Sequence, residues 1–145
     1  MKTMKKKIFP RISTPLSAVV TSEEGIHLKV TAMDTSQTGF SFQCSTFQRN
    51  SLTPGGCFIP NGRPIELDVI VELPFPDHSL HIKALCHVAF SRRIASDKCE
   101  IGMRYEGFDG DGYNDLIKFI EFNSIVIPAL IELPNSVYRK EQLCA

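Results

Sequence analysis

A polar segment, Asp34-Thr35-Ser36-Gln37-Thr38-Gly39, separates two stretches in which apolar and polar residues alternate. Asp34 carries a charge and accepts hydrogen bonds, and Ser36 can both donate and accept them. Asp and Ser side chains also fold back onto backbone N–H groups, which stiffens a turn before any ligand arrives. Gly39 allows a backbone or a ligand to approach closely. The segment is therefore a candidate binding turn, and a turn built for conformational reasons alone has the same local composition.

Basic residues gather ahead of this turn, near the N-terminus. The cluster comprises Lys2, Lys5, Lys6, Lys7 and Arg11. The formal net charge of the chain is +0, so an anionic ligand would have to be met by a local cluster of this kind and not by a global field. Pro10 and Pro15 favour an extended backbone around Arg11. An extended cationic arm suits a phosphate ligand, whereas a solvated basic tail is the commoner use of such a run.

The order of these segments resembles the PilZ domain family. Proteins of that family bind cyclic di-GMP through an R-x-x-x-R segment followed by a D-x-S-x-x-G segment. Here Lys7 and Arg11 precede Asp34, Ser36 and Gly39, and the resemblance extends over residues 7–122. It implies that these five residues bind the ligand and that the arm folds over a β-barrel when the ligand binds. The sequence departs from the pattern at Lys7, where the family has an arginine, and lysine reproduces a planar bidentate contact poorly.

Cyclic di-GMP would offer these residues two phosphates and two guanine edges. Arg11 can pair with guanine O6 and N7, stack on a base or grip a phosphate. Asp34 can accept from guanine N1–H and N2–H or hold Arg11, Ser36 can bond a phosphate or guanine, and Lys7 supplies a point charge. Gly39 leaves room beside the ligand. One hypothesis is thus a cyclic di-GMP receptor that changes conformation and signals to a protein partner. The other is a PilZ-like protein-interaction module with weak or no ligand binding.

Six alternating stretches predict the strands that must position the turn, and they indicate an all-β, six-stranded antiparallel barrel with a C-terminal helix. The stretches are residues 17–21, 26–33, 40–44, 65–73, 80–91 and 99–105. Asp109 or Asp111 is expected to cap the helix that covers one mouth of the barrel. Its predicted apolar stripe comprises Tyr113, Leu116, Ile117 and Ile120. Residues 45–62, rich in Gly and Pro, predict a long irregular connection.

The predicted organisation is a basic arm (1–16), a PilZ-like barrel with its closing helix (17–122), and a C-terminal extension (123–145). The extension contains an apolar segment, 124–133, which is a candidate for packing on the barrel or for a dimer or partner surface. No apolar run reaches the length of about 18 residues that a membrane helix needs. No secretion signal follows the basic N-terminus either, so a cytoplasmic protein without nucleic-acid polymers as partners is expected.

Catalysis and metal binding find little support in the sequence. The five cysteines form no C-x-x-C pair, and we interpret them as reduced, mostly small core residues and not as zinc ligands. His81 and His87 share one face of a strand, but the usual rise separates them by about 20 Å, too far to share a metal or a proton. His78 could approach His81 at a hairpin, yet no third ligand or nucleophile accompanies them. We expect a protein that is not an enzyme and has no cofactor.

Overall fold

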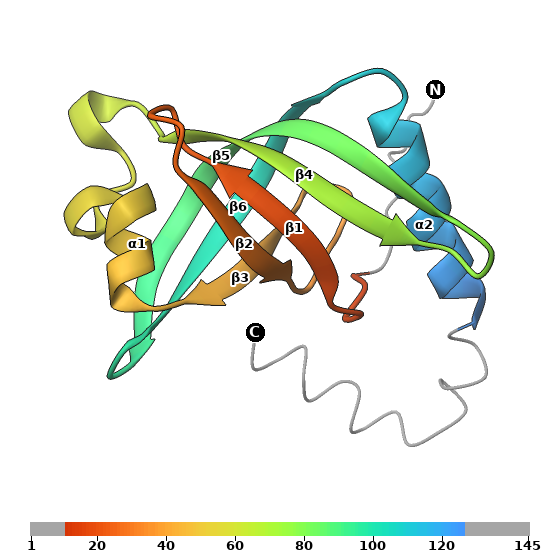
Figure 1. Ribbon diagram of the computed structural model, residues 1–145, viewed down its shortest axis with the longest axis horizontal. Coiled ribbons are helices and arrows are strands. Elements are labelled where there is room, and N and C mark those ends of the chain that lie inside the picture. Colours follow the sequence, from red (N-terminus) through yellow and green to blue (C-terminus); the bar gives the residue numbers. More distant parts are fainter. Residues whose placement is uncertain (1–10, 127–145) are drawn as a thin grey trace, which may run out of the picture.

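The computed structural model describes residues 11–126, so Lys7 and most of the predicted C-terminal extension lie outside the described residues. Six antiparallel strands form one sheet, which confirms the predicted all-β fold with a C-terminal helix (Figure 1). The strands are β1 (Leu16–Thr21), β2 (His27–Ala32), β3 (Gly39–Cys44), β4 (Glu66–Pro74), β5 (Ser79–Ala95) and β6 (Lys98–Phe108). Two helices, α1 (Thr46–Leu52) and α2 (Gly112–Val126), lie at opposite ends of the molecule.

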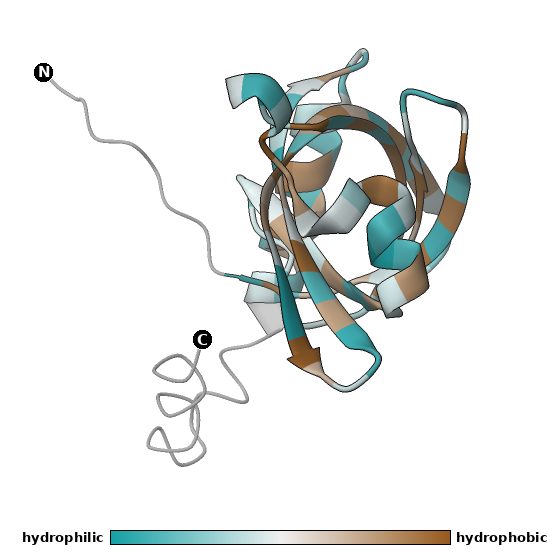
Figure 2. Ribbon diagram, turned by 90° about the vertical axis from the view of Figure 1, so that its left-hand side faces the viewer, coloured by the Kyte–Doolittle hydropathy of each residue, from teal (hydrophilic) through white to brown (hydrophobic). Residues whose placement is uncertain are grey.

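The sheet curls until its two edge strands nearly meet. Its strand order is β2-β1-β4-β5-β6-β3, so β2 and β3 are the edges. An isolated antiparallel bridge joins them, in which Met33 N donates to Ser41 O at 2.7 Å and Ser41 N donates to Met33 O at 3.0 Å. Figure 2, turned by a right angle, shows the strands curling around a shared interior. The barrel is therefore only partly closed, and the β2–β3 seam depends on this bridge.

The alternating pattern of the strands determines which side chains are buried in the core, as β4 illustrates. Its buried side chains, Leu67, Val69, Val71 and Leu73, occupy every second position. Asp68 and Ile70, between them, are exposed. Successive side chains of a strand point to opposite faces, so the apolar half of the pattern fills the barrel and the other half faces outward.

β5 breaks this alternation at Phe90, which the alternation of residues 80–91 predicts on the core face. The register of the β5–β6 pair shifts between Val88 and Phe90, and the Phe90 side chain is 36% exposed. Its ring covers Gly102 on β6, so closely that a Cβ at Gly102 would lie 2.1 Å from it. The Arg92 guanidinium then lies 5.2 Å from the centre of the Phe90 ring. The irregularity turns an expected core residue into the outer cover of a glycine.

The prediction of an irregular connection over residues 45–62 was wrong. Ser45 caps α1 by accepting from Gln48 N at 3.1 Å, and Gln48 Oε1 accepts from Ser45 N at 2.9 Å. This reciprocal pair is a capping box, whose S-x-x-Q signature is present in the sequence and could have predicted the helix. Thr46 N donates to Asp97 Oδ1 at 3.1 Å, which ties α1 to the β5–β6 hairpin. Two short helical turns follow, at Pro54–Gly56 and Pro60–Gly62.

The closing helix α2 buries a slightly different stripe from the one predicted. Its buried side chains are Leu116, Phe119 and Ile120, which are spaced at i, i+3 and i+4. Tyr113, expected in the stripe, is 42% exposed. Phe119 meets Phe75 of the β4–β5 connection edge-on, with 5.6 Å between ring centres. The helix begins directly after Asp111 and continues to Val126, four residues beyond the predicted end of the barrel unit.

Candidate ligand-binding site

The turn between β2 and β3 is stiffened by Ser36. The Ser36 side chain is buried, accepts from Thr38 N at 3.2 Å and donates to Gly39 O at 3.3 Å. Ser36 N also donates to Gly39 O, at 2.8 Å. Asp34 adopts φ +49°, a left-handed conformation that Asp tolerates better than most residues do. The expected folding of a polar side chain onto the backbone is thus present at Ser36, and it uses the hydroxyl within the turn.

Gly39 is required by strand packing. A Cβ at Gly39 would lie 1.9 Å from the carbonyl oxygen of Met103 on β6. Gly39 pairs with Arg104 in the β3–β6 ladder, so the close approach is a property of the sheet. This contact explains the glycine without any ligand, and the role of Gly39 beside a ligand stays a prediction.

Arg11 reaches the turn, as the order of the motifs predicts. Its Nη1 donates to the backbone oxygen of Asp34 at 2.8 Å. Next to it, Ile12 N donates to Thr35 O at 2.7 Å, and Thr35 N donates to Ile12 O at 3.0 Å. The Ile12 side chain is buried in the core and anchors this segment, while Arg11 and Asp34 remain exposed. The structure therefore brings Arg11, Asp34, Ser36 and Gly39 together.

Tyr105 is a neighbour of the turn that the sequence did not single out for this place. Its backbone N–H donates to Thr38 O at 2.9 Å, and its ring lies 5.8 Å from that of Phe40 and 4.7 Å from that of Phe108. Burial raises the pKa of the Tyr105 phenol well above its ordinary value. The phenol is thus neutral at physiological pH, and Tyr105 supports the turn by packing.

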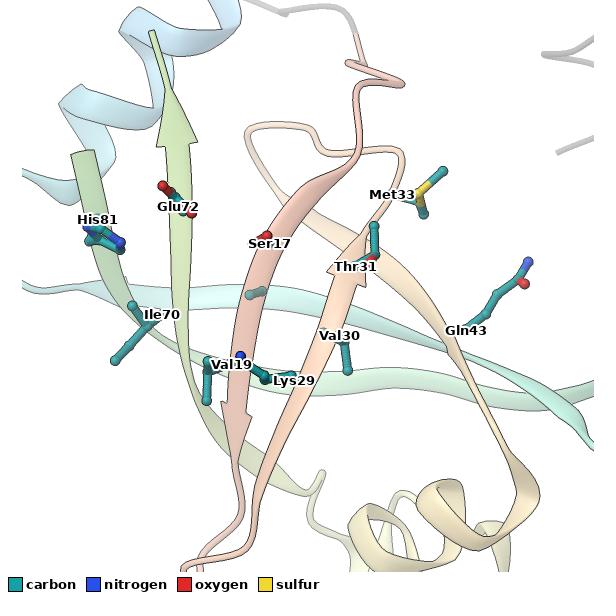
Figure 3. A pocket seen from close by; sticks show the side chains of 11 residues that line it. Ser17, Val19, Lys29, Val30, Thr31, Met33, Gln43, Ile70, Glu72 and His81 are labelled. Atoms are coloured by element: carbon teal, nitrogen blue, oxygen red, sulfur yellow. The ribbon is translucent and has the colours of Figure 1, made fainter. Parts of the chain in front are cut away.

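A groove of about 740 Å³ lies on the outer face of β1, β2 and β4, beside the turn (Figure 3). Met33, which directly precedes Asp34, and Gln43 lie on one side of it, and Glu72 and His81 lie on the other. Lys29 lies between these two sides. The groove is outside the set of predicted site residues, because its lining comes from strands that are distant in sequence. The sequence signal from which these lining residues could have been predicted is their outward position in the alternating strands.

The described residues do not form a metal centre. Between residues 11 and 126, no group of three or more His, Cys, Asp and Glu side chains could hold a metal ion. Nδ1 of His27, His78 and His87 lies within hydrogen-bond distance of Thr21 Oγ1 (2.8 Å), Asp77 Oδ1 (2.7 Å) and Glu106 Oε2 (2.8 Å), respectively. Within the same range, no helix combines the length and the apolar character that crossing a membrane requires.

Replacing Ser36 by alanine should weaken the turn, since it removes all three side-chain hydrogen bonds of a buried hydroxyl, to Gly39 O, Thr38 N and Thr38 Oγ1. We expect the free energy of unfolding to fall by about 1 kcal/mol, measured by urea denaturation. Ser17→Ala, at an exposed strand position, is the matched control and should change stability by less than about 0.5 kcal/mol. Equal effects of the two substitutions would show that the Ser36 bonds do not stabilise the fold.

Comparison with known proteins supports the fold. No protein-family model matches the chain, and no curated protein matches it. Among solved structures, the chain is similar to the Bacillus subtilis inhibitor of motility, MotI/DgrA, with a TM-score of 0.61 and 17% sequence identity. The match covers 86% of this chain and 54% of the other, so the chain spans about half the length of that protein. The likeness, at this identity, shows the fold alone: the curled antiparallel sheet and C-terminal helix of this chain are similar in fold to part of that protein.

Proposed function

We propose that the protein is a cyclic di-GMP receptor that passes the signal to a protein partner and is not an enzyme. The observation that carries the proposal is the hydrogen bond of 2.8 Å between Arg11 Nη1 and the backbone oxygen of Asp34. It holds the described end of the basic arm against the D-x-S-x-x-G turn, and the backbone bridge between Ile12 and Thr35 reinforces the contact. Arg11 and Asp34 are both exposed, so an incoming ligand can reach them.

The exposed groups match the chemistry of this ligand. A guanidinium carries five N–H donors, so Arg11 can bond Asp34 O and still offer a fork to guanine O6 and N7 or to a phosphate. The Asp34 carboxylate can accept from guanine N1–H and N2–H. Ser36 and Gly39 act in this proposal by fixing the shape of the turn, since both are engaged within the fold. Lys7 adds a positive charge for a phosphate.

The groove next to Met33 provides room for the rest of the ligand. Its volume, about 740 Å³, lies within the range of roughly 300–1,000 Å³ that small-molecule sites occupy. A ligand with two nucleobases can thus place one at the turn and extend the other along the outer face of β1 and β2. Apolar walls from Val19 and Ile70 and polar groups from Lys29 and Glu72 suit a nucleotide.

The partner is proposed to be a protein that recognises the arm after it folds over the ligand. The similar solved structure is named as an inhibitor of motility, a description of regulation and not of catalysis. We extend a regulatory role to this chain, as a cytoplasmic protein that signals to a protein partner. The apolar segment 124–133, which lies mostly outside the described residues, stays a candidate surface for this partner or for a second copy of the chain.

Calorimetric titration of the purified protein with cyclic di-GMP tests the proposal, and a separate titration with GTP is the control. We expect saturable binding that GTP does not reproduce. Arg11→Ala should weaken it by about 1–3 kcal/mol, which is roughly fivefold to more than a hundredfold in Kd. Arg93→Ala, at an exposed arginine of the β5–β6 hairpin, is the matched control and should bind normally. Absence of heat at high ligand concentration would exclude the receptor and leave the protein-interaction module.

Lys7→Arg should tighten the binding of cyclic di-GMP, because it restores the planar fork that the R-x-x-x-R pattern contains. The same titration measures the change, and Lys2→Arg, in the same basic arm but outside the motif spacing, is its control. An unchanged Kd for Lys7→Arg, with Arg11→Ala still impaired, would remove Lys7 from the binding site and leave Arg11 in it.

A further inference from the structure

Two buried cysteines face each other across the β3–β6 ladder. Cys44 is the last residue of β3, Cys99 lies at the start of β6, and the register pairs them directly. Cys44 is 9% exposed and Cys99 is fully buried, so both side chains point to the core face of the sheet. Both thiols are free in this structure. The sequence indicated only core residues here, because the pairing of positions 44 and 99 is a property of the fold.

Directly opposed strand residues come close to the geometry of a disulfide. Their Cα atoms are about 4.5–5.5 Å apart, and a disulfide accepts about 4.4–6.8 Å. Opposed Cβ atoms lie about 4.5–5.5 Å apart, so the two side chains would have to approach by up to about 1 Å. Burial raises the pKa of the Cys44 thiol, and the neighbouring Cys99 raises it further.

We propose that Cys44 and Cys99 are a redox site that a peroxide converts into a cross-strand disulfide. The Cys44 sulfur attacks one oxygen of hydrogen peroxide, which gives a sulfenic acid and one water. The Cys99 sulfur then attacks the Cys44 sulfur and displaces a second water, which forms the S–S bond. Two thiols are oxidised by two electrons, and one peroxide is reduced to two waters. Cys44 reacts first because it is the more exposed of the two.

Oxidation of Cys44 by peroxide should be slow at neutral pH and faster at alkaline pH. The thiolate is the nucleophile, and the pKa of Cys44 is raised to about 11, so very little thiolate is present at pH 7. The thiolate fraction grows tenfold with each pH unit below the pKa, so oxidation at pH 9 should be about a hundred times faster than at pH 7. The buried position admits a small oxidant such as peroxide and disfavours bulky disulfides such as oxidised glutathione.

The disulfide would link β3 covalently to β6, whereas an isolated bridge joins β3 to β2 on its other side. β3 meets β2 through the Met33–Ser41 bridge, and a Cys44–Cys99 bond would join β3 covalently to β6 at the end opposite Gly39. The bond closes a loop of about 55 residues, which restricts the unfolded chain strongly. A rise in Tm of roughly 5–15 °C follows from this restriction for a domain of this size.

Peroxide treatment of the full chain at pH 9 tests the site, in a Cys57→Ser/Cys144→Ser background that removes the exposed Cys57 and the cysteine near the C-terminus. We expect a loss of two thiols, a mass decrease of about 2 Da, and a proteolytic peptide that joins the segments around Cys44 and Cys99. The reaction should raise the Tm and be reversed by dithiothreitol.

Two variants separate a paired reaction from simple oxidation. Cys44→Ala should abolish the cross-linked peptide, whereas Cys86→Ala should retain it, because Cys86 is also buried but lies opposite Leu67 and Tyr105. The inference is wrong if peroxide converts Cys44 to a sulfinic acid without cross-linking. It is equally wrong if both thiols survive conditions that fully oxidise Cys57 in the unmodified chain, or if the linked peptide involves Cys86.

Discussion

Gly39→Ala should cost about 3 kcal/mol or more of the free energy of unfolding, because the new methyl group has no space to occupy. It would lie 1.9 Å from the Met103 carbonyl oxygen, which is part of the backbone of the neighbouring strand and cannot rotate away. The two strands must separate at this point, and the separation breaks the β3–β6 ladder where the candidate turn ends and β3 begins. Urea denaturation of the purified variant measures the loss.

Two glycines of the neighbouring strand β6, Gly102 and Gly107, serve as matched controls for this prediction. Gly107→Ala meets nothing within 4 Å and should change stability by no more than about 0.5 kcal/mol. In Gly102→Ala the new methyl group meets the Phe90 ring, a side chain on the outer face that can rotate aside. The stability lost in this variant should therefore lie between that of Gly39→Ala and that of Gly107→Ala. A Gly39 variant as stable as the Gly107 variant would mean that β3 packs less tightly on β6 than the structure indicates.

The Phe119→Ala substitution in α2 should destabilise the protein by about 3–5 kcal/mol, as expected for the removal of a buried aromatic ring. Phe119 is 1% exposed and contacts Phe75 edge-on at 5.6 Å, so its loss leaves a cavity where α2 covers the barrel. Domains of this size have only about 5–15 kcal/mol of stability in total. The variant should therefore unfold at a much lower urea concentration.

Phe122→Ala is the control for Phe119, because the two rings touch the same partner and differ in burial. Phe122 lies 5.9 Å from Phe75 but is 38% exposed, so its loss should cost about 1 kcal/mol. Denaturation curves of both variants, followed by far-UV circular dichroism, make the comparison. Similar midpoints for the two variants would show that α2 is not anchored by its buried face.

The strands and the position of the candidate turn could be predicted from sequence because both depend on local patterns. Alternation in β4 and β5 identifies inward and outward residues without knowledge of the neighbours. The D-x-S-x-x-G spacing placed Asp34 and Ser36 between two strands, where the structure has them. The contact of Arg11 with this turn was also anticipated, although the acceptor is the Asp34 backbone oxygen and not its carboxylate.

Features that depend on a distant strand could not be predicted in this way. Phe90 has the alternation of a core residue, but a register shift against β6 moves it to the outer face. Position 39 requires a glycine because a Cβ there would clash with the carbonyl oxygen of Met103, more than 60 residues further along the chain. The outer groove likewise combines residues from several strands. Helix α1 is a different case, because its capping box is a local pattern from which the helix can be predicted without knowledge of a distant strand.

The pairing of β3 with β6 also sets an order of events on the ribosome. Cys44 leaves the ribosome about 55 residues before its partner position, Cys99. Synthesis at roughly 5–20 residues per second then leaves β3 without its ladder for about 3–11 seconds. Hairpins form within about 1–10 microseconds, so β1–β2 and β4–β5 can pair long before β3 does. The nascent chain thus exposes Phe40 and Phe42 during this interval, so β3 offers an apolar segment to a chaperone until β6 has been made.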